Sequence, residues 1–280
     1  MKLFKRKHAD PLKELAEVVG DDAVPAFPAS TTTILRQLRD LDIGVDEIAE
    51  SLQYDPGLVV RVLKTVNSAA FGLSVRIADI GHAVHLMGRS QLESIVLALT
   101  VKQVLPEQAV QGFDAARYWQ TAARRAALAR TLADQLHPAT QADCFTSGLL
   151  QDMAVPVLAC RKDEYGQLLC EWHAHSGSNL AHLERDSFGW DHGQLGALMG
   201  ESWALPEPLI ATIRAHHPGG SELETEPAVQ LVGLLREHAD DSDQDLLIEE
   251  ARNFGLDPDW TRCAIDRSEE QARDLVNGLC

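Results

Sequence analysis

Aromatic residues and long apolar runs are both scarce in this sequence. Phe, Trp and Tyr make up 5% of the 280 residues, which favours helices packed through Leu, Ala and Val over an aromatic-rich β-sandwich. No run of roughly 18 apolar residues occurs, so we expect no transmembrane helix. The basic N-terminal residues have no apolar segment behind them, and this is not the pattern of a secretory signal.

Cysteines at metal-binding or disulfide spacing are absent as well. The cysteines are odd in number and irregularly spaced, without a Cys-x-x-Cys pair: Cys144, Cys160, Cys170, Cys263 and Cys280. Such a set is typical of free thiols in a reducing compartment. We therefore expect a cytoplasmic protein.

Positive charge is also in short supply. The chain carries 42 acidic and 25 basic residues, a formal net charge of −17, and its acidic residues are dense after Ser221. Such a surface repels phosphate backbones, which excludes general nucleic-acid binding. The exception is a basic cluster near the start, which we expect to be a solvated tail: Lys2, Lys5, Arg6 and Lys7.

Helical periodicity runs through nearly the whole chain, and no stretch alternates apolar and polar residues as a half-buried strand would. Asp55-Pro56 predicts a helix start, because a capping Asp precedes Pro at the first helical position. Gly72 and Gly88 are expected to end helices, and Pro106–Gly112 to separate two lobes. The fold class is all-α, with helices predicted at Pro11–Val19, Thr31–Leu41, Asp46–Leu52, Pro56–Val66, Asp79–Met87, Gln91–Leu105, Asp114–Leu136, Asp143–Ala154, Val157–Arg161, Tyr165–His175, Leu180–Phe188, His192–Trp203, Pro206–His216, Pro227–Ala239, Gln244–Phe254 and Pro258–Leu279.

The octet Ser147–Ala154 places Gln151 and Asp152 side by side in an apolar segment predicted to be helical. A carboxylate in such a setting needs a partner, because an unpaired buried charge is costly. A His at position 151 would indicate a metal-dependent phosphohydrolase. The residue is Gln, and a neutral amide is a poor ligand for a transition metal.

Three passages of the sequence together resemble the HDOD family, a bacterial output domain related to the HD phosphohydrolases. The first is Asp55–Gly72, the second is Ile80–Leu99, and the third is a series of short motifs: Gly148–Asp152, Gly189–His192, Trp203–Pro206 and His216–Pro218. The resemblance implies a multi-helix bundle of HD type with an N-terminal helical lobe. It also implies a division into an arm (1–24), an HDOD domain (25–239, with lobes at about 25–106 and 113–239) and an acidic C-terminal helical extension (240–280).

The same resemblance implies a degenerate metal site. The positions similar to the HD ligands are Thr121, Gln151, Asp152 and Arg236, and of these only Asp152 is an HD ligand type. One carboxylate does not hold an ion tightly enough to activate water. This implies a pseudoenzyme without a bound cofactor. We expect Asp152 to be held instead by Arg236, Gln151 or Thr121, with a guanidinium–carboxylate pair replacing the ion.

His192, His216 and His217 leave a metal interpretation open. Together with Asp152 they would suffice by number for a zinc ion. Against this, a His near a helix C-terminus is favoured by the helix dipole alone. Neighbouring residues of a helix also point about 100° apart, so His216 and His217 would rarely reach one ion.

Two further features of the sequence can be interpreted either as binding sites or as groups with a purely structural role. Asn67 and Ser68 lie in a predicted turn that would contact a ligand or partner, or would only bond the local backbone. The arginines of the long helix at 114–136 would bind an anion, or would be solvated or paired with the acidic C-terminal segment: Arg117, Arg124, Arg125 and Arg130.

These observations support three functions. The first is a non-catalytic bacterial signal-transduction or scaffold protein that binds a regulatory protein partner or a small ligand. The second is a metal-dependent phosphohydrolase or phosphodiesterase with a rearranged site of Asp152, His192, His216 and His217. The third is a sensor that binds a nucleotide without turnover.

Overall fold

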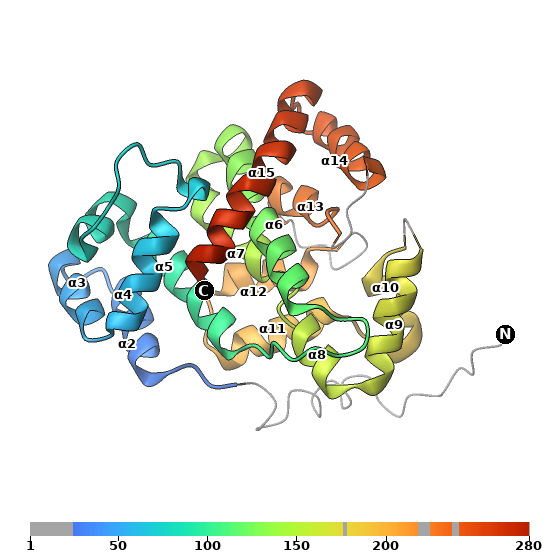
Figure 1. Cartoon of the computed structure of the whole chain (residues 1–280), viewed down its shortest axis with the longest axis horizontal. Helices are drawn as coiled ribbons and strands as arrows, with labels where there is room; N and C mark the ends of the chain where they lie inside the picture. The colour runs from blue at the N-terminus through green and yellow to red at the C-terminus, as the bar shows by residue number, and fades with distance from the viewer. Residues whose placement is uncertain (1–24, 176–177, 218–224, 237–240, 280) are drawn as a thin grey trace. The chain divides into compact units, whose positions relative to one another are not determined.

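The computed structural model describes residues 25–175, 178–217, 225–236 and 241–279. Within these ranges the regular structure is helical, and the β structure is an isolated bridge between Val110 and Phe113. The prediction of an all-α fold is confirmed (Figure 1). The expected arm at 1–24 lies outside the described residues, as does Cys280. Over the described chain, no helix is both long and apolar enough to cross a membrane.

Two compact units divide the described chain. The first contains Leu105–Tyr118 and Gln151–Thr225, together with Pro25; the second contains Ala26–Val104, Trp119–Leu150 and the chain from Glu226 onward. Both are assembled from segments that are not contiguous in sequence. The units are therefore defined by which helices pack together and not by continuous ranges of the chain. The expected lobes, at about 25–106 and 113–239, stay a prediction.

The first unit is a series of short helices, each packed on the next: α8 (Val155–Arg161), α9 (Asp163–Ala174), α10 (Leu180–Phe188), α11 (His192–Ser202) and α12 (Glu207–Ala215) (Figure 1). Asn179 caps the start of α10, and Gly189 ends that helix in the left-handed region with a φ of 84°. Asp191 and Gln194 then form a capping box at the start of α11. These caps fix the backbone on either side of the link between the two helices.

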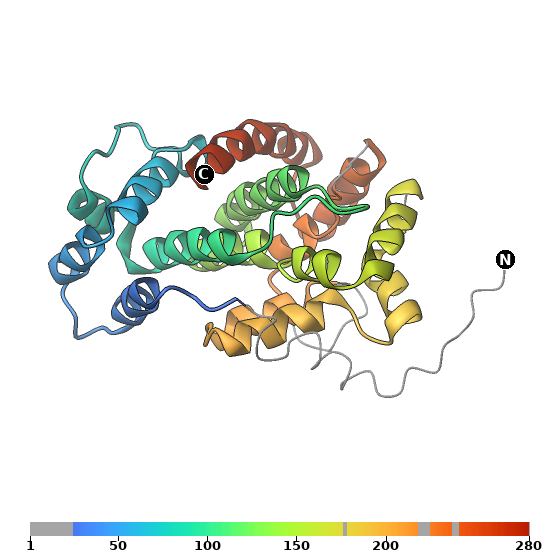
Figure 2. The same ribbon diagram turned by 60° about the horizontal axis from the view of Figure 1, so that its bottom comes forward.

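The second unit is built around α5 (Ile80–Val104), which packs against α2 (Ala29–Arg39), α3 (Val45–Gln53), α4 (Pro56–Val66) and α7 (Gln141–Leu150) (Figure 2). The helix is interrupted at Gly88, which has a φ of 72°, in agreement with the predicted stop. After this point the helix is apolar nearly all round, so its side chains are buried by several neighbours at once.

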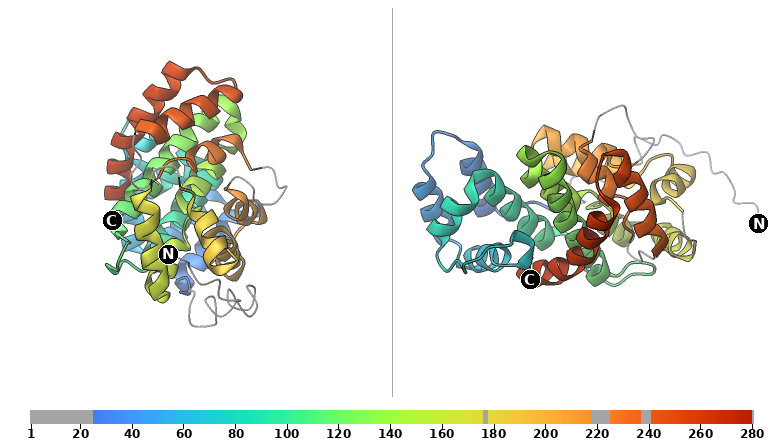
Figure 3. Two further views of the ribbon diagram at one scale, coloured as in Figure 1. Left: turned by 90° about the vertical axis from the view of Figure 1, so that its right-hand side faces the viewer. Right: turned by 90° about the horizontal axis from the view of Figure 1, so that it is seen from above.

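The acidic C-terminal segment belongs to the second unit. Its helices α14 (Asp241–Asn253) and α15 (Pro258–Leu279) pack side by side (Figure 3). Their inner residues share a core with α6 (Ala115–Leu136), α7 and α13 (Pro227–Val232); this shared core includes Leu247, Ile248, Ala251, Ala264 and Ile265. Acidic residues such as Asp266, Glu269 and Glu270 stay exposed on the outer face. The segment is therefore a packed helical pair with an acidic surface.

The predicted helix at Asp143–Ala154 is wrong at its C-terminal end. Helix α7 ends at Leu150, and residues 151–154 form a turn before α8. The reason is Pro156, whose ring would collide with the carbonyl of residue 152 in a continuous helix and which has no N–H to donate to it. Gln151 and Asp152 are therefore turn residues, so the Asp152 side chain is not confined to a helix face.

Candidate metal centre

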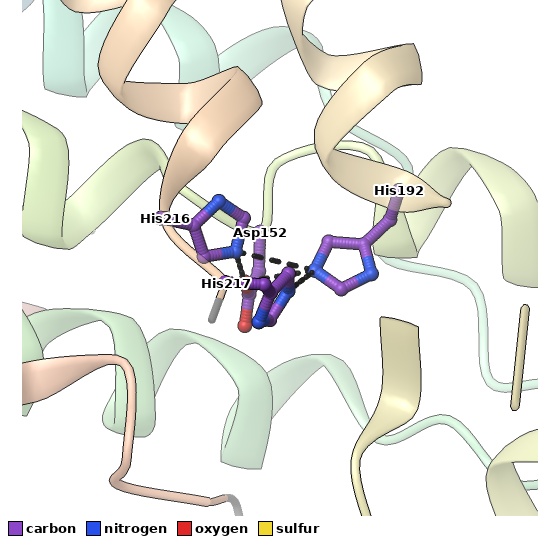
Figure 4. Close-up of side chains that lie close together, drawn as sticks. All are labelled: Asp152, His192, His216 and His217. Atoms are coloured by element: carbon purple, nitrogen blue, oxygen red, sulfur yellow. Dashed lines mark hydrogen bonds and ion pairs between the residues drawn. The ribbon is translucent and has the colours of Figure 1, made fainter. Parts of the chain in front are cut away.

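Four side chains of the first unit converge on one point (Figure 4). Asp152 comes from the turn before α8, His192 from the first residue of α11, and His216 and His217 from the two residues that follow α12. One ligand atom from each side chain lies within 4.8 Å of the others. The four residues are brought together only by folding, since they come from three separate places in the chain.

The spacing of these atoms fits a small metal ion. Ligand atoms held tetrahedrally at about 2.0–2.1 Å from Zn²⁺ lie roughly 3.3 Å apart. Asp152 Oδ1 lies 3.3 Å from His192 Nε2 and 3.0 Å from His216 Nε2, and the two Nε2 atoms lie 3.3 Å apart. His217 Nε2 lies 2.7 Å from His192 Nε2, closer than two ligands of one ion. The separations of the His217 ligand atom from those of Asp152 and His216 are within 4.8 Å, so the His217 ring would have to shift before all four atoms could bind one ion tetrahedrally.

The other ring nitrogens of two of these histidines are already occupied. His216 Nδ1 lies 2.6 Å from the carbonyl oxygen of Ile213, and His192 Nδ1 lies 2.7 Å from Glu184 Oε2. A carbonyl and a carboxylate only accept, so each Nδ1 is the donor. In the neutral ring this leaves the Nε2 lone pair free for a metal, which is the tautomer that metal-binding histidines need.

Close packing of α11 on α12 brings the histidines together. Gly196 of α11 faces Ile213 of α12, and a Cβ atom at Gly196 would lie 2.8 Å from Ile213 Cγ2. A Cβ at Gly193 would likewise lie 3.1 Å from the Ile213 carbonyl oxygen. Because these positions have no side chain, the start of α11 lies close to the end of α12, and His192 reaches His216.

A buried carboxylate supports the site from behind. Glu184 of α10 is fully buried and bonds His192 at both its backbone N and its Nδ1, while Tyr165 of α9 donates to the other carboxylate oxygen. Burial opposes a charge on His192, but Glu184 and Asp152 outweigh it and raise the pKa of His192 to about 10. The site therefore attracts positive charge.

Comparison with known proteins places the chain in a family. The HDOD domain profile matches residues 24–218, which is most of the chain and contains all four converging residues. The chain belongs to the HDOD domain family. The expected HDOD resemblance, drawn from motifs between Pro25 and Ala239, is confirmed.

Relatives of this HDOD domain include an uncharacterized protein of Treponema pallidum, 31% identical over 212 residues. That match covers 73% of this chain and 40% of the relative, so the chain matches about two-fifths of the relative's length. Similar crystal structures include an HDOD domain protein of unknown function from Geobacter sulfurreducens, with 22% identity and a TM-score of 0.73, covering 95% of this chain and 97% of that one.

Two other crystal structures have the same fold. A protein of Shewanella amazonensis SB2B, provisionally named a phosphohydrolase, is 22% identical with a TM-score of 0.73 and covers 96% of this chain and 99% of that one. A protein of Marinobacter aquaeolei VT8, provisionally named a signal transduction protein, is 18% identical with a TM-score of 0.70 and covers 99% of this chain and 67% of that one. At these identities the likeness establishes the HD-type fold.

The structure corrects part of the expected degenerate site. Gln151 is 1% exposed, and neither atom of its amide group has a hydrogen-bond partner among the described residues. The prediction that Gln151 holds Asp152 is therefore wrong, because Asp152 instead contacts His192 and His216. Thr121 is buried on α6, and Arg236 is half-buried after α13, both in the second unit. Their predicted roles stay predictions.

The expectation that His216 and His217 would rarely reach one ion is also wrong, because the two residues do not lie on one helix: α12 ends at Ala215. The two rings are therefore not held to helical spacing, and their centroids lie 3.9 Å apart. Glu184 and Tyr165 were not predicted as site residues, because an acid within an amphipathic helix resembles a solvated surface group.

The turn at Asn67 and Ser68 has a local structural role. The Asn67 amide donates to the carbonyls of Leu63 and Ile77 and accepts from the Ile77 N–H, so its side chain bonds the local backbone. Ser68 is buried and its hydroxyl has no partner in the described chain. Both residues line a groove of about 1190 Å³ between α4, the following loop and α15. An interface role for this turn stays a prediction.

The arginines of α6 mostly bind the protein itself. Arg124 pairs with Glu269 of α15 at 3.1 Å, Arg125 donates to the carbonyl of Leu235, and Arg130 donates to the carbonyl of Ala70. Arg117 pairs with Asp114 at 3.7 Å. The alternative of pairing with the acidic segment therefore holds for Arg124, and these contacts leave little support for an anion-binding strip.

Proposed function

We propose that this HDOD domain is a non-catalytic signalling module that holds one divalent transition-metal ion and binds a regulatory protein partner. The observation that carries the metal part is the convergence of Asp152, His192, His216 and His217 (Figure 4). Three imidazoles and one carboxylate form a donor set suited to Zn²⁺ and its late first-row neighbours, whereas Mg²⁺ and Ca²⁺ prefer oxygen ligands alone.

The number of ligands favours a structural or regulatory ion. Catalytic zinc sites in general keep three protein ligands and an open position for water, whereas structural sites are closed by four. An ion bound here would offset the charges of Asp152 and Glu184 and would join the Asp152 turn to α11 and α12. The fold shared with the Marinobacter aquaeolei protein provisionally named for signal transduction is compatible with such a role.

Phosphodiester hydrolysis is the second candidate, because Asp152 and His217 are only partly buried. If either ligand left the ion, a water molecule would have access to it, and a bound metal would lower the pKa of that water. The fold shared with the Shewanella amazonensis protein provisionally named a phosphohydrolase is compatible with this alternative.

Metal analysis combined with an activity assay distinguishes these functions. The purified chain is loaded with Zn²⁺ or Mn²⁺, dialysed, analysed by mass spectrometry for metal, and assayed with bis-p-nitrophenyl phosphate. We expect about one ion per chain and no turnover. Turnover that disappears in His217→Ala would establish the hydrolase instead, and a chain that retains no ion would refute the metal proposal.

The groove between α4 and α15 is the surface that we assign to the partner. It exposes Val60 and Val75 beside Lys64 and Arg76 in a chain of strongly negative charge, although Asp274 also lines it. Its chemistry fits a peptide segment that carries acidic and apolar side chains, and this favours a protein partner over a nucleotide.

A labelled peptide of alternating Glu and Leu probes this groove by fluorescence anisotropy. Binding should weaken at least several-fold in Lys64→Glu, which removes the attraction for the Glu side chains of the peptide, and in Val75→Asp, which removes an apolar contact with its Leu side chains. Arg262→Glu makes the same charge change as Lys64→Glu at an exposed site outside the groove and should have little effect on peptide binding. Equal weakening in all three variants would show non-specific attraction and overturn the assignment.

A further inference from the structure

We infer that Glu184, held by Tyr165, is a positioning residue that sets the affinity of the site for its metal ion. This inference rests on the proposed metal site and extends it to a second layer of residues behind the ligands. The two residues lie on α9 and α10, whereas the ligand they act on, His192, begins α11.

Every strong contact of Glu184 is directed at His192 or at Tyr165. Its Oε2 atom lies 2.8 Å from the His192 backbone N and 2.7 Å from His192 Nδ1. Its Oε1 atom lies 2.5 Å from the Tyr165 hydroxyl. A single carboxylate oxygen thus fixes both the backbone and the ring of His192, and this leaves the ring one orientation, with Nε2 directed at the other three ligands.

The Tyr165 end of this chain of contacts is held by aromatic packing. The Tyr165 ring stacks on Phe188 with centroids 6.3 Å apart, and Phe188 stacks on Trp190 at 5.2 Å. All three rings are buried. Since the phenol cannot swing away without disrupting this stack, the Glu184 carboxylate is held at one end by the stack and at the other by His192.

The negative charge of Glu184 indicates a role beyond packing. A carboxylate with no exposed surface is costly unless positive charge compensates it. Glu184 makes no ion pair with Lys or Arg in the described chain, and its charged partner there is His192 alone. A divalent ion at His192 Nε2 would supply that charge through the ring, as in the carboxylate–histidine–zinc arrangement of metalloproteins.

Three variants test the role of Glu184 through the dissociation constant for Zn²⁺, measured by competition with a chromophoric chelator. Glu184→Gln keeps the shape but removes the charge, and loss of such an outer residue weakens metal binding about 10- to 100-fold. Tyr165→Phe should weaken it by a smaller factor. Glu201→Gln neutralises a partly exposed carboxylate of α11 outside the site and should leave the constant unchanged.

Thermal melting with and without Zn²⁺ separates positioning from simple support of the fold. A positioning role predicts that Glu184→Gln reduces the rise in Tm that Zn²⁺ produces, and that Glu184→Asp restores part of it. An unchanged dissociation constant in Glu184→Gln would overturn the inference while the metal site stands. A wild-type chain that binds no Zn²⁺ would remove the metal site itself. If Glu184→Gln fails to fold, the same two measurements on Tyr165→Phe test the inference: an unchanged dissociation constant for Zn²⁺ and an unchanged rise in Tm would overturn it.

Discussion

His217 differs from the other two histidines in its surroundings. His192 and His216 are buried and each has an Nδ1 partner, whereas His217 is partly exposed and follows the end of α12. Removing a buried, bonded group leaves its partner unsatisfied, which costs about 1–3 kcal/mol. The same change at a partly exposed group avoids most of that penalty, so His217 is the ligand best suited to test metal binding apart from folding.

We expect His217→Ala to weaken Zn²⁺ binding at least tenfold and to change the Tm of the metal-free chain little. The reason is that one of four ligands is lost while the buried partners of the other three are kept. Chelator competition and thermal melting measure the two effects. His182→Ala removes an exposed histidine of α10 and serves as the control. Equal Zn²⁺ affinity in the two variants would remove His217 from the site.

Gln151 is a second residue whose substitution is informative. Its buried amide has no partner in the described chain, and an unpaired buried polar group costs about 1–3 kcal/mol. Gln151→Leu has a similar volume and no polar atoms, so we expect the free energy of unfolding to stay the same or to rise by about 1 kcal/mol. Urea denaturation measures it. A loss of more than about 2 kcal/mol would instead indicate a bound water network.

Cys144 is predicted to be chemically inert. Burial is the main cause that raises the pKa of its thiol to about 12, so at pH 8 the reactive thiolate is a negligible fraction. Iodoacetamide should modify the exposed Cys170 and Cys263 in the folded chain and Cys144 only after unfolding, as read by peptide mass spectrometry. Modification of Cys144 at the same rate as Cys170 would contradict its burial.

At the scale of helices, a capping pattern located the start of α4, whereas the predicted helices at Asp143–Ala154 and Pro227–Ala239 run past the observed ends of α7 and α13, at Leu150 and Val232. Asp55 accepts from the Leu58 N–H and Pro56 begins α4, as the capping pattern predicts. The end of α7 was missed, because a helical apolar pattern continues past Leu150 and Pro156 acts on the turn before it. The same error placed Asp152 on a helix face. Where a side chain points therefore depended on a helix end that periodicity does not show.

The contact of α11 with α12 yields a prediction at this scale. A Cβ atom at Gly196 would lie 2.8 Å from Ile213 Cγ2, so Gly196→Ala should push the helices apart. We expect a loss of about 1–3 kcal/mol in unfolding free energy and weaker Zn²⁺ binding, because His192 and His216 separate. Gly44→Ala has open space around its Cβ and is the control. Unchanged Zn²⁺ affinity in Gly196→Ala would show that the contact does not set the site.

At the scale of the whole molecule, composition and motif order were sufficient for the fold class and the family. The residues of the candidate site were also named from the sequence, but their convergence was not predictable. His192 and His216 meet through a close helix pair, and Glu184 is buried by the packing of α9, α10 and α11. Both depend on tertiary contacts, whereas helical periodicity and capping patterns describe neighbours along the chain.

We propose that Asp152, the one position of the implied HD site that keeps a ligand type, can still hold an ion together with His192, His216 and His217. Metal content per chain tests it most directly, measured by mass spectrometry on protein purified without an affinity tag and equilibrated with Zn²⁺. We predict about one ion per chain in the wild type and a clear loss in a His216→Ala, His217→Ala double variant that still folds. A wild-type chain with no ion above the level of that variant would contradict the claim.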